Sequence, residues 1–174
     1  MNFSLDKSLE ILTNTPKVVN AMLRGLSADW TMENEGGESW SAFDIVGHLI
    51  HGEKTDWVER TSIILKDGEP ETFTPFDRFA QFEDSKGKSL EQLLNQFDAL
   101  RSKNLAWIRA LNLNEGDYNK IGIHPALGEA TLSQLLSSWV VHDLSHIAQI
   151  SRVLAHQYKD EVGPWKAYLK ILDI

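Results

Sequence analysis

Two histidines in the C-terminal part of the chain, His142 and His146, have the spacing of metal ligands. They lie four residues apart in a stretch predicted as a long helix, so their side chains stand one turn apart on the same face. Two imidazoles placed in this way can bind one metal ion through one nitrogen each. On a helical wheel His146 falls within the apolar face and His142 at its edge, which favours a core or cleft position over two solvated side chains. A pair of core histidines satisfied by hydrogen bonds is the alternative structural interpretation.

A zinc-type site needs at least one further protein ligand, and the chain offers four more histidines: His48, His51, His124 and His156. On the wheel of their helix, His48 lies just outside the apolar face and His51 lies further toward solvent. The periodicity therefore prefers His48 as the third ligand. We expect His124 in a loop that approaches one end of the fold, and His156 on the polar side of its helix.

Three acidic residues are expected on apolar helix faces. Asp143 lies near the middle of the face that carries the two histidines, and a lone buried carboxylate is costly unless it is paired. It could accept a hydrogen bond from a metal-binding imidazole, or it could pair with an arginine elsewhere in the chain. Glu53 and Asp56 fall on the apolar side of their helix, where Arg60 or Arg78 are the expected partners. Alternatively, these two arginines bind a substrate carboxylate.

The elements that must position these residues are helices. Apolar periodicity predicts four long ones, from Ser4 to about Leu26, from Ser41 to near Asp67, from Ser89 to Leu111 and from about Thr131 to about Tyr158. Pro16 should kink or break the first helix, and Ser41 with Asp44 resembles a capping box. A short helix from Pro164 to Leu172 is expected to follow. Because no alternating strand pattern accompanies them, we expect an all-α four-helix bundle in a single domain, residues 1–174.

Two connections are long. The one from Glu71 to Lys88 has no helical period over most of its length and carries four phenylalanines: Phe73, Phe76, Phe79 and Phe82. These side chains either pin a crossover to the core, which is the more common use of aromatic residues, or form a wall or lid over a pocket. The connection from Asn112 to Glu129, which contains glycines and a proline, is expected to be a loop.

The composition excludes several classes of site and disfavours several partners. The chain has 174 residues, a formal net charge of −8 and no cysteine. The acidic balance argues against nucleic-acid and anionic-membrane partners. Without cysteine there is neither a disulfide nor a thiolate ligand, so a transition metal must bind His, Asp or Glu. No signal peptide or membrane-spanning run is found, and we expect a cytoplasmic protein.

Several short motifs follow one another in a characteristic order: Trp40-Ser41, Gly47-His48-Leu49, the loop from Gly122 to Gly128 leading to Thr131-Leu132, His142 and His146 with Gln149-Ile150, and the tail Val162-Gly163-Pro164-Trp165. This ordered set resembles the DinB-like superfamily of metal-binding four-helix proteins. The resemblance implies an up-down-down-up bundle with a long crossover between the second and third helices. It also implies that His48, His142 and His146 bind one divalent metal ion, typically zinc or nickel.

The resemblance also carries an expectation about activity. Characterised relatives include thiol S-transferases that use bacillithiol-like thiols and mycothiol-dependent isomerases, and family members are often dimers. We therefore expect a metal-dependent enzyme that transfers a low-molecular-weight thiol to a small-molecule substrate, in a homodimer. The absence of cysteine fits a thiol supplied from outside the chain.

Three other interpretations stay open. The protein could be a non-catalytic metal-binding or stress-response module, or a bundle whose histidines are only core residues. It could also be a metal-dependent hydrolase, which would need a general base near the metal. Glu53, Asp56 and Glu59 lie within two or three turns of His48.

Overall fold

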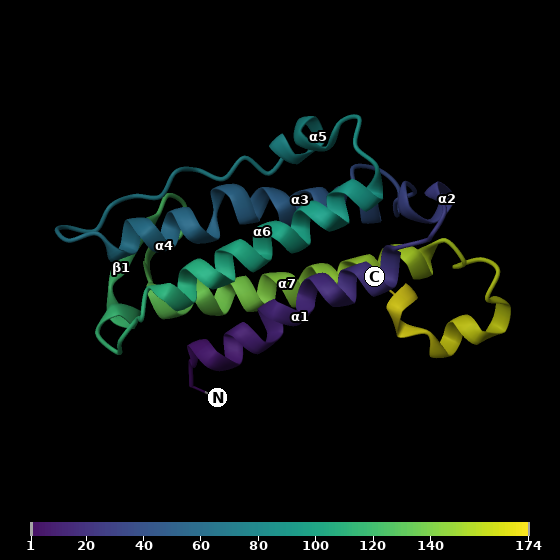
Figure 1. Ribbon diagram of the computed structural model, residues 1–174. Coiled ribbons are helices and arrows are strands. Elements are labelled where there is room, and N and C mark those ends of the chain that lie inside the picture. The colour runs from purple at the N-terminus through teal and green to yellow at the C-terminus, as the bar shows by residue number, and fades with distance from the viewer. Residues whose placement is uncertain (1, 174) are drawn as a thin grey trace.

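Four long helical segments pack side by side in the computed structural model, which describes residues 2–173 (Figure 1). They are α1 (Leu5–Leu23), the consecutive helices α3 (Ala42–Thr55) and α4 (Trp57–Leu65), α6 (Leu90–Ala110) and α7 (Leu132–His156). In Figure 1, α1 and α7 run in one direction, whereas the α3–α4 segment and α6 run in the other. The chain is therefore a four-helix bundle in the predicted up-down-down-up order.

The predicted long crossover joins the second and third helical segments. Because α4 ends at the opposite end of the bundle from the start of α6, the chain has to return along the outside of α3 (Figure 1). This return carries a short helix, α5 (Ala80–Ser85), which packs against α3. Gly47 allows the close approach, because a Cβ at this position would lie 2.5 Å from Oγ of Ser85.

Capping boxes mark where three of the long helices begin. In each capping box, a Ser or Thr hydroxyl accepts from the backbone N–H three residues on, and that residue's side chain accepts from the backbone N–H of the cap. The boxes pair Ser41 with Asp44, Ser89 with Gln92, and Thr131 with Gln134. The capping box predicted at Ser41 is thereby confirmed.

The first two helices depart from the expected pattern at single residues. The helix predicted from Ser41 is interrupted at Asp56, whose φ of −116° and ψ of −77° separate α3 from α4. By contrast, α1 continues through Pro16 without a break. Proline has no N–H to donate to the carbonyl four residues earlier, that of Leu12. Arg101 of α6 donates to this carbonyl instead, with Nη1 at 2.9 Å from the oxygen.

The expected loop from Asn112 to Glu129 contains a β-hairpin. Strands β1 (Ile121–His124) and β2 (Gly128–Thr131) pair antiparallel, with Ile121 opposite Thr131 and His124 opposite Gly128. The crossover adds to this hairpin, because Phe73 N donates to Ile123 O at 2.8 Å. Strands of four residues are too short to give the alternation that marks a strand in a sequence.

The remaining elements are short. They are α2 (Ala28–Thr31) and the 3₁₀ segments η1 (Asp117–Asn119), η2 (Gly163–Tyr168) and η3 (Lys170–Leu172). The tail helix predicted from Pro164 to Leu172 is therefore two 3₁₀ segments. No helix within residues 2–173 is long and apolar enough to cross a membrane.

The apolar core consists of two clusters of buried side chains. One includes Val19, Leu49, Phe97 and Ile150, and the other includes Leu12, Trp57, Leu105 and Trp139. Along the long helical segments, a short stretch lies between the residues of one cluster and those of the other. Glu53, Arg101 and Asp143 lie in this stretch on α3, α6 and α7, and all three are almost fully buried. A polar layer thus divides the core, and His142 directly precedes one of its members, Asp143, on α7.

Candidate metal centre

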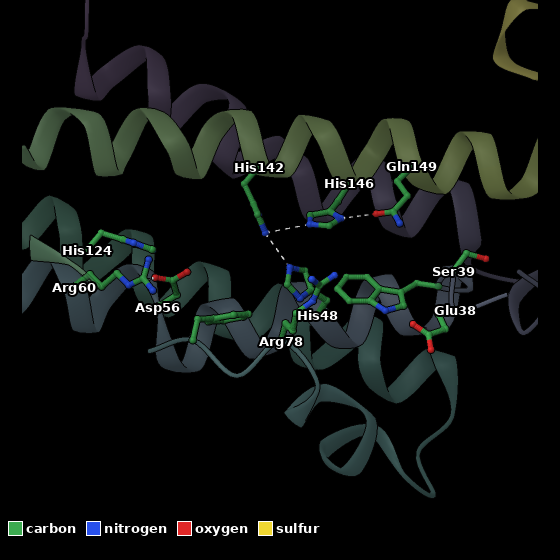
Figure 2. A pocket seen from close by; sticks show the side chains of 12 residues that line it. Glu38, Ser39, His48, Asp56, Arg60, Arg78, His124, His142, His146 and Gln149 are labelled. Carbon is green, nitrogen blue, oxygen red and sulfur yellow. Dashed lines mark hydrogen bonds and ion pairs between the residues drawn. The ribbon is translucent and has the colours of Figure 1, made fainter. Parts of the chain in front are cut away.

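The structure brings His48, His142 and His146 together. Nε2 of His142 lies 3.0 Å from Nε2 of His48 and 3.1 Å from Nε2 of His146, and one ligand atom from each residue falls within 4.8 Å of the others. His48 comes from α3 and the other two come from successive turns of α7. Figure 2 shows the three imidazoles pointing toward one another from the two helices.

The protonation of this cluster favours free nitrogen lone pairs. Burial, with the neighbouring charges of His146 and His142, lowers the pKa of His48 to about 3. Burial and the charge of His142 lower the pKa of His146 to about 4. At neutral pH these imidazoles are therefore uncharged, which is the state that binds a metal ion.

The geometry of the cluster fits a metal ion. Ligand atoms at about 2.0–2.1 Å from one ion in tetrahedral geometry lie about 3.3 Å apart, close to the spacings around His142. Without a cation, three Nε2 atoms this close cannot all be satisfied, because a neutral imidazole nitrogen either donates or accepts. The residues present can therefore hold a divalent ion and leave coordination positions open.

One hydrogen bond orients a clustered imidazole, and a nearby carboxylate places its charge beside another. Nδ1 of His146 lies 2.8 Å from Oε1 of Gln149, so an N–H at Nδ1 donates to the amide oxygen and leaves the lone pair on Nε2. Nδ1 of His142 lies 4.0 Å from Oδ1 of Asp143. This second distance is too long for a hydrogen bond but places a negative charge beside the imidazole.

Asp143 has its main partner elsewhere, in a buried ion network behind the histidines. Arg101 donates to Oδ2 of Asp143 at 2.6 Å and to Oδ1 at 3.0 Å, and to Oε1 of Glu53 at 2.7 and 2.9 Å. Glu53 accepts further hydrogen bonds from Asn104 and Trp139. The network answers the question that the sequence left open: the aspartate pairs with an arginine on another helix.

The pKa values of the two carboxyl groups shift in opposite directions. Desolvation raises the pKa of Glu53 despite its contacts with Arg101. Desolvation also opposes ionisation of Asp143, but its interactions with His142 and Arg101 outweigh that effect and hold its pKa below the ordinary value. Since Glu53 and Asp143 share one guanidinium, Arg101 balances one negative charge, and the carboxyl whose pKa is lowered, that of Asp143, is the one more readily ionised.

Sequence reasoning did not identify Arg101. Glu53 was expected to pair with Arg60 or Arg78, and it pairs with Arg101 instead. The signal was present in the spacing, because position 101 continues the buried series Leu94, Phe97, Leu105 and Ile108 of α6. A charged residue within such a series indicates a buried partner.

The three histidines border a cavity of about 580 Å³. Trp40, Phe76 and Arg78 also line it, and the Arg78 guanidinium lies 5.8 Å from the Trp40 ring centroid. A second group, Asp56, Arg60 and His124, lines the cavity on the far side of His142 from Gln149 (Figure 2). Asp56 pairs with Arg60 as expected, with Oδ1 2.7 Å from Nε.

The other histidines do not join the cluster. His51 is buried, although the periodicity placed it toward solvent, because the crossover covers this face of α3 with Phe76 and Asp84. His124 lines the cavity without contributing a nitrogen to the cluster of three. His156 lies beside Lys159, with Nε2 3.1 Å from Nζ.

The four phenylalanines of the crossover have different environments. Phe73 is 2% exposed and packs in the core, whereas Phe79 and Phe82 are 61% and 42% exposed. Phe76 forms part of the cavity wall, with its ring centroid 5.6 Å from that of His48. Phe73 therefore anchors the crossover in the core, and Phe76 contributes to the wall of the cavity.

The solved structures that are similar to this chain include two four-helix bundles. YfiT from Bacillus subtilis, described as a probable metal-dependent hydrolase with an unusual four-helix bundle topology, matches with a TM-score of 0.76 and 21% identity over 90% of each chain. TT2238, described as a four-helix bundle protein, matches with a TM-score of 0.53 and 16% identity, over 85% of this chain and 98% of that one. At these identities the likeness shows the fold.

The sequence itself shows the family. A search of the curated proteins found no match. The sequence model of the DinB superfamily matches residues 11–150, a range that contains all three clustered histidines. The chain therefore belongs to the DinB superfamily.

Proposed function

We propose that His48, His142 and His146 bind a divalent metal ion, zinc or nickel, and that the protein is a metal-dependent thiol S-transferase. The observation that carries this proposal is the convergence of three Nε2 atoms beside an open cavity. The three ligands would be neutral imidazoles, so the bound ion would keep its full positive charge. Because there are only three of them, coordination positions would stay open.

The proposed reaction joins a low-molecular-weight thiol to a small electrophile. The thiol loses its S–H proton, a sulfur–carbon bond forms, and the leaving group departs with its electron pair and takes up a proton. A metal ion at the three histidines would lower the pKa of a bound thiol so that the thiolate is present near neutral pH. The chain has no cysteine, so the sulfur must come from the cosubstrate.

The protein's own residues would prepare this step. Gln149 keeps the lone pair of His146 on Nε2. Trp40 and Phe76 line the cavity beside His48 with apolar surface, which excludes water from the bound sulfur. None of these roles requires a general base.

The pairing of Glu53 and of Asp56 disfavours hydrolysis in which either of these carboxylates is the general base. Hydrolysis needs a group that accepts a proton from water. Glu53 is fully engaged by Arg101 and Asn104 and does not line the cavity. Asp56 lines the cavity but is held by Arg60.

A metal-dependent hydrolase is the second candidate. Burial raises the pKa of Asp56 despite the charge of Arg60, which moves this carboxylate toward the basicity that proton transfer near neutral pH requires. The similar protein YfiT is itself described as a probable metal-dependent hydrolase. In this alternative, Asp56 is the general base.

An activity comparison separates the two candidates. Zinc-loaded, nickel-loaded and metal-free protein are mixed with 1-chloro-2,4-dinitrobenzene and a series of low-molecular-weight thiols, and in parallel with ester and amide substrates. We expect metal-dependent thiol conjugation, which His142→Ala abolishes and His156→Ala leaves intact. Hydrolysis that depends on Asp56, without thiol conjugation, would establish the second candidate. A protein that binds the metal but shows neither activity is a non-catalytic binding module.

A further inference from the structure

One end of the cavity is formed by three side chains that the proposed metal site does not use. Asp56 lies at the break between α3 and α4, Arg60 lies one turn into α4, and His124 ends β1. All three line the cavity, and Figure 2 shows them converging on the opposite side of His142 from Gln149. Helix and hairpin thus bring together two nitrogen donors and a carboxylate.

Arg60 is held so that one edge of its guanidinium stays available. Its Nε lies 2.7 Å from Oδ1 of Asp56, and its guanidinium carbon lies 5.2 Å from the ring centroid of Phe73. The whole residue is 9% exposed. Because Asp56 is engaged through Nε, the two Nη groups remain as a fork, and neither donates to another residue within residues 2–173.

His124 is held in one tautomer by the turn that follows β1. Its Nδ1 accepts hydrogen bonds from the backbone N–H groups of Ala126 and Leu127, both at 3.1 Å. A ring nitrogen that accepts must carry its lone pair, so the proton of the neutral imidazole lies on Nε2. The group that His124 offers to the cavity is therefore a donor.

A single buried ring supports both donors. Phe73 is 2% exposed, and its ring centroid lies 6.5 Å from that of His124, in addition to the cation–π contact with Arg60. Gly122 makes room for this ring, because a Cβ there would overlap Phe73 and Ile64. The two donors consequently rest on a packed part of the fold and are fixed before any ligand binds.

We propose that Arg60 and His124 form a carboxylate subsite of the cavity. The Nη fork and the Nε2–H are donors only, and a carboxylate offers two acceptor oxygens with the charge and planarity that an arginine fork recognises. A divalent ion at the three histidines would make the cavity as a whole favourable to an anion. This inference rests on the proposed function in one respect: the ligand is an acid whose other end reaches the three histidines.

Matched ligands and variants test the subsite. Metal-free and cobalt-loaded protein are each titrated with 3-mercaptopropionate and with the uncharged 3-mercaptopropionamide, and binding is followed through the ring resonances of His124 and through calorimetry. The variants are Arg60→Lys, which keeps a charge beside Asp56 but loses the fork, and His124→Asn. In the second variant the Asn side-chain oxygen can replace Nδ1 as the acceptor of the turn, while the Nε2–H donor is lost.

Wild-type protein is expected to bind the acid at least about tenfold more tightly than the amide, and each variant to lose most of this preference. Arg24→Gln is the control, because Arg24 forms an exposed pair with Glu91 and does not line the cavity. Equal binding of acid and amide by wild-type protein, or an unchanged preference in both variants, would overturn the proposal. Near-ultraviolet circular dichroism of each variant verifies folding.

The titrations also separate this subsite from the metal proposal. If the protein fails to bind metal but metal-free protein still prefers the acid, the carboxylate subsite stands and the proposed function falls. If metal binds stoichiometrically and the preference for the acid is absent, the reverse holds.

Discussion

Arg101 donates a 2.9 Å hydrogen bond to the carbonyl oxygen of Leu12, the acceptor that Pro16 leaves without its usual helical partner. The same guanidinium binds Glu53 of α3 and Asp143 of α7. From its position on α6, Arg101 therefore contacts the other three long helical segments of the bundle.

Replacing Arg101 should cost far more stability than replacing a surface arginine. In Arg101→Met, the two buried carboxylates lose the guanidinium that pairs with both, and breaking a buried pair in this way costs about 3–5 kcal/mol. Arg24→Met is the control, because the Arg24–Glu91 pair is 38% and 71% exposed and such pairs contribute less than about 1 kcal/mol. Urea unfolding of both variants measures the difference, and equal losses would show that the network does not stabilise the fold.

Removing any one of the three clustered histidines should prevent stoichiometric metal binding. In His48→Ala, His142→Ala and His146→Ala, we expect zinc affinity to fall by more than about 100-fold, because the loss of a ligand exceeds the loss of a residue that only orients one. Metal content after equilibration with zinc and desalting gives the readout. His156→Ala should bind zinc as wild-type protein does, and a full metal content in His142→Ala would refute the assignment.

Gln149 should tune the metal affinity through His146. Its Oε1 accepts from Nδ1 of His146 at 2.8 Å, and loss of such a contact typically weakens metal binding about 10–100-fold. We expect affinity to fall in Gln149→Leu and to rise in Gln149→Glu, where a carboxylate accepts the same proton. Competition titrations with a chelator compare the metal affinities of the wild-type protein, Gln149→Leu and Gln149→Glu. The reverse order of affinities would mean that His146 binds through Nδ1.

The metal-free protein should lose stability as the pH falls from about 7 to about 5. Burial lowers the pKa of His48 from 6.5 to about 3 and that of His146 to about 4. Below pH 6.5 the unfolded chain therefore binds protons that the folded chain excludes, so the free energy of unfolding decreases with decreasing pH in this window. Urea unfolding at several pH values measures the slope.

The matched control for this pH dependence is His48→Gln combined with His146→Gln. Glutamine does not titrate, so most of the slope between about pH 5 and 7 should disappear. A double variant with the wild-type slope would place the responsible groups elsewhere.

Gly122→Ala should destabilise the end of the bundle that carries the hairpin. The new Cβ would overlap the buried Phe73 ring and Ile64, and such overpacking costs about 1–3 kcal/mol. Gly116→Ala is the control, because its Cβ would meet only Oδ1 of Asn114, at 3.0 Å. Thermal unfolding compares the two variants. Equal melting temperatures would show that the hairpin tolerates displacement of Phe73.

The bundle was predictable because it depends on periodicity. Apolar residues at helical spacing and the cap at Ser41 located the long helices, and the ordered motifs indicated the up-down-down-up order that Figure 1 displays. The hairpin was missed because its register follows from the turn near Pro125 and from contact with Phe73, neither of which leaves a period in the sequence.

The candidate site was predictable in its histidines and not in its supports. The spacing of His142 and His146, the periodicity around His48 and the family resemblance all selected residues that the fold does bring together. The Glu53–Arg101 pair spans 48 positions, and no local pattern reports such a contact. The prediction that His51 faces solvent was wrong because a helical wheel considers one helix alone. It does not include the crossover, whose Phe76 packs against His51.

The separation of 94 positions between His48 and His142 has a consequence for the order in which the protein is completed. A chain emerging from the ribosome displays His48 long before α7 exists, and until α7 docks Arg101 lacks Asp143. The buried polar layer therefore receives its second carboxylate only when the last long helix arrives. Synthesis thus delivers two of the three clustered histidines and the second partner of Arg101 in the same segment.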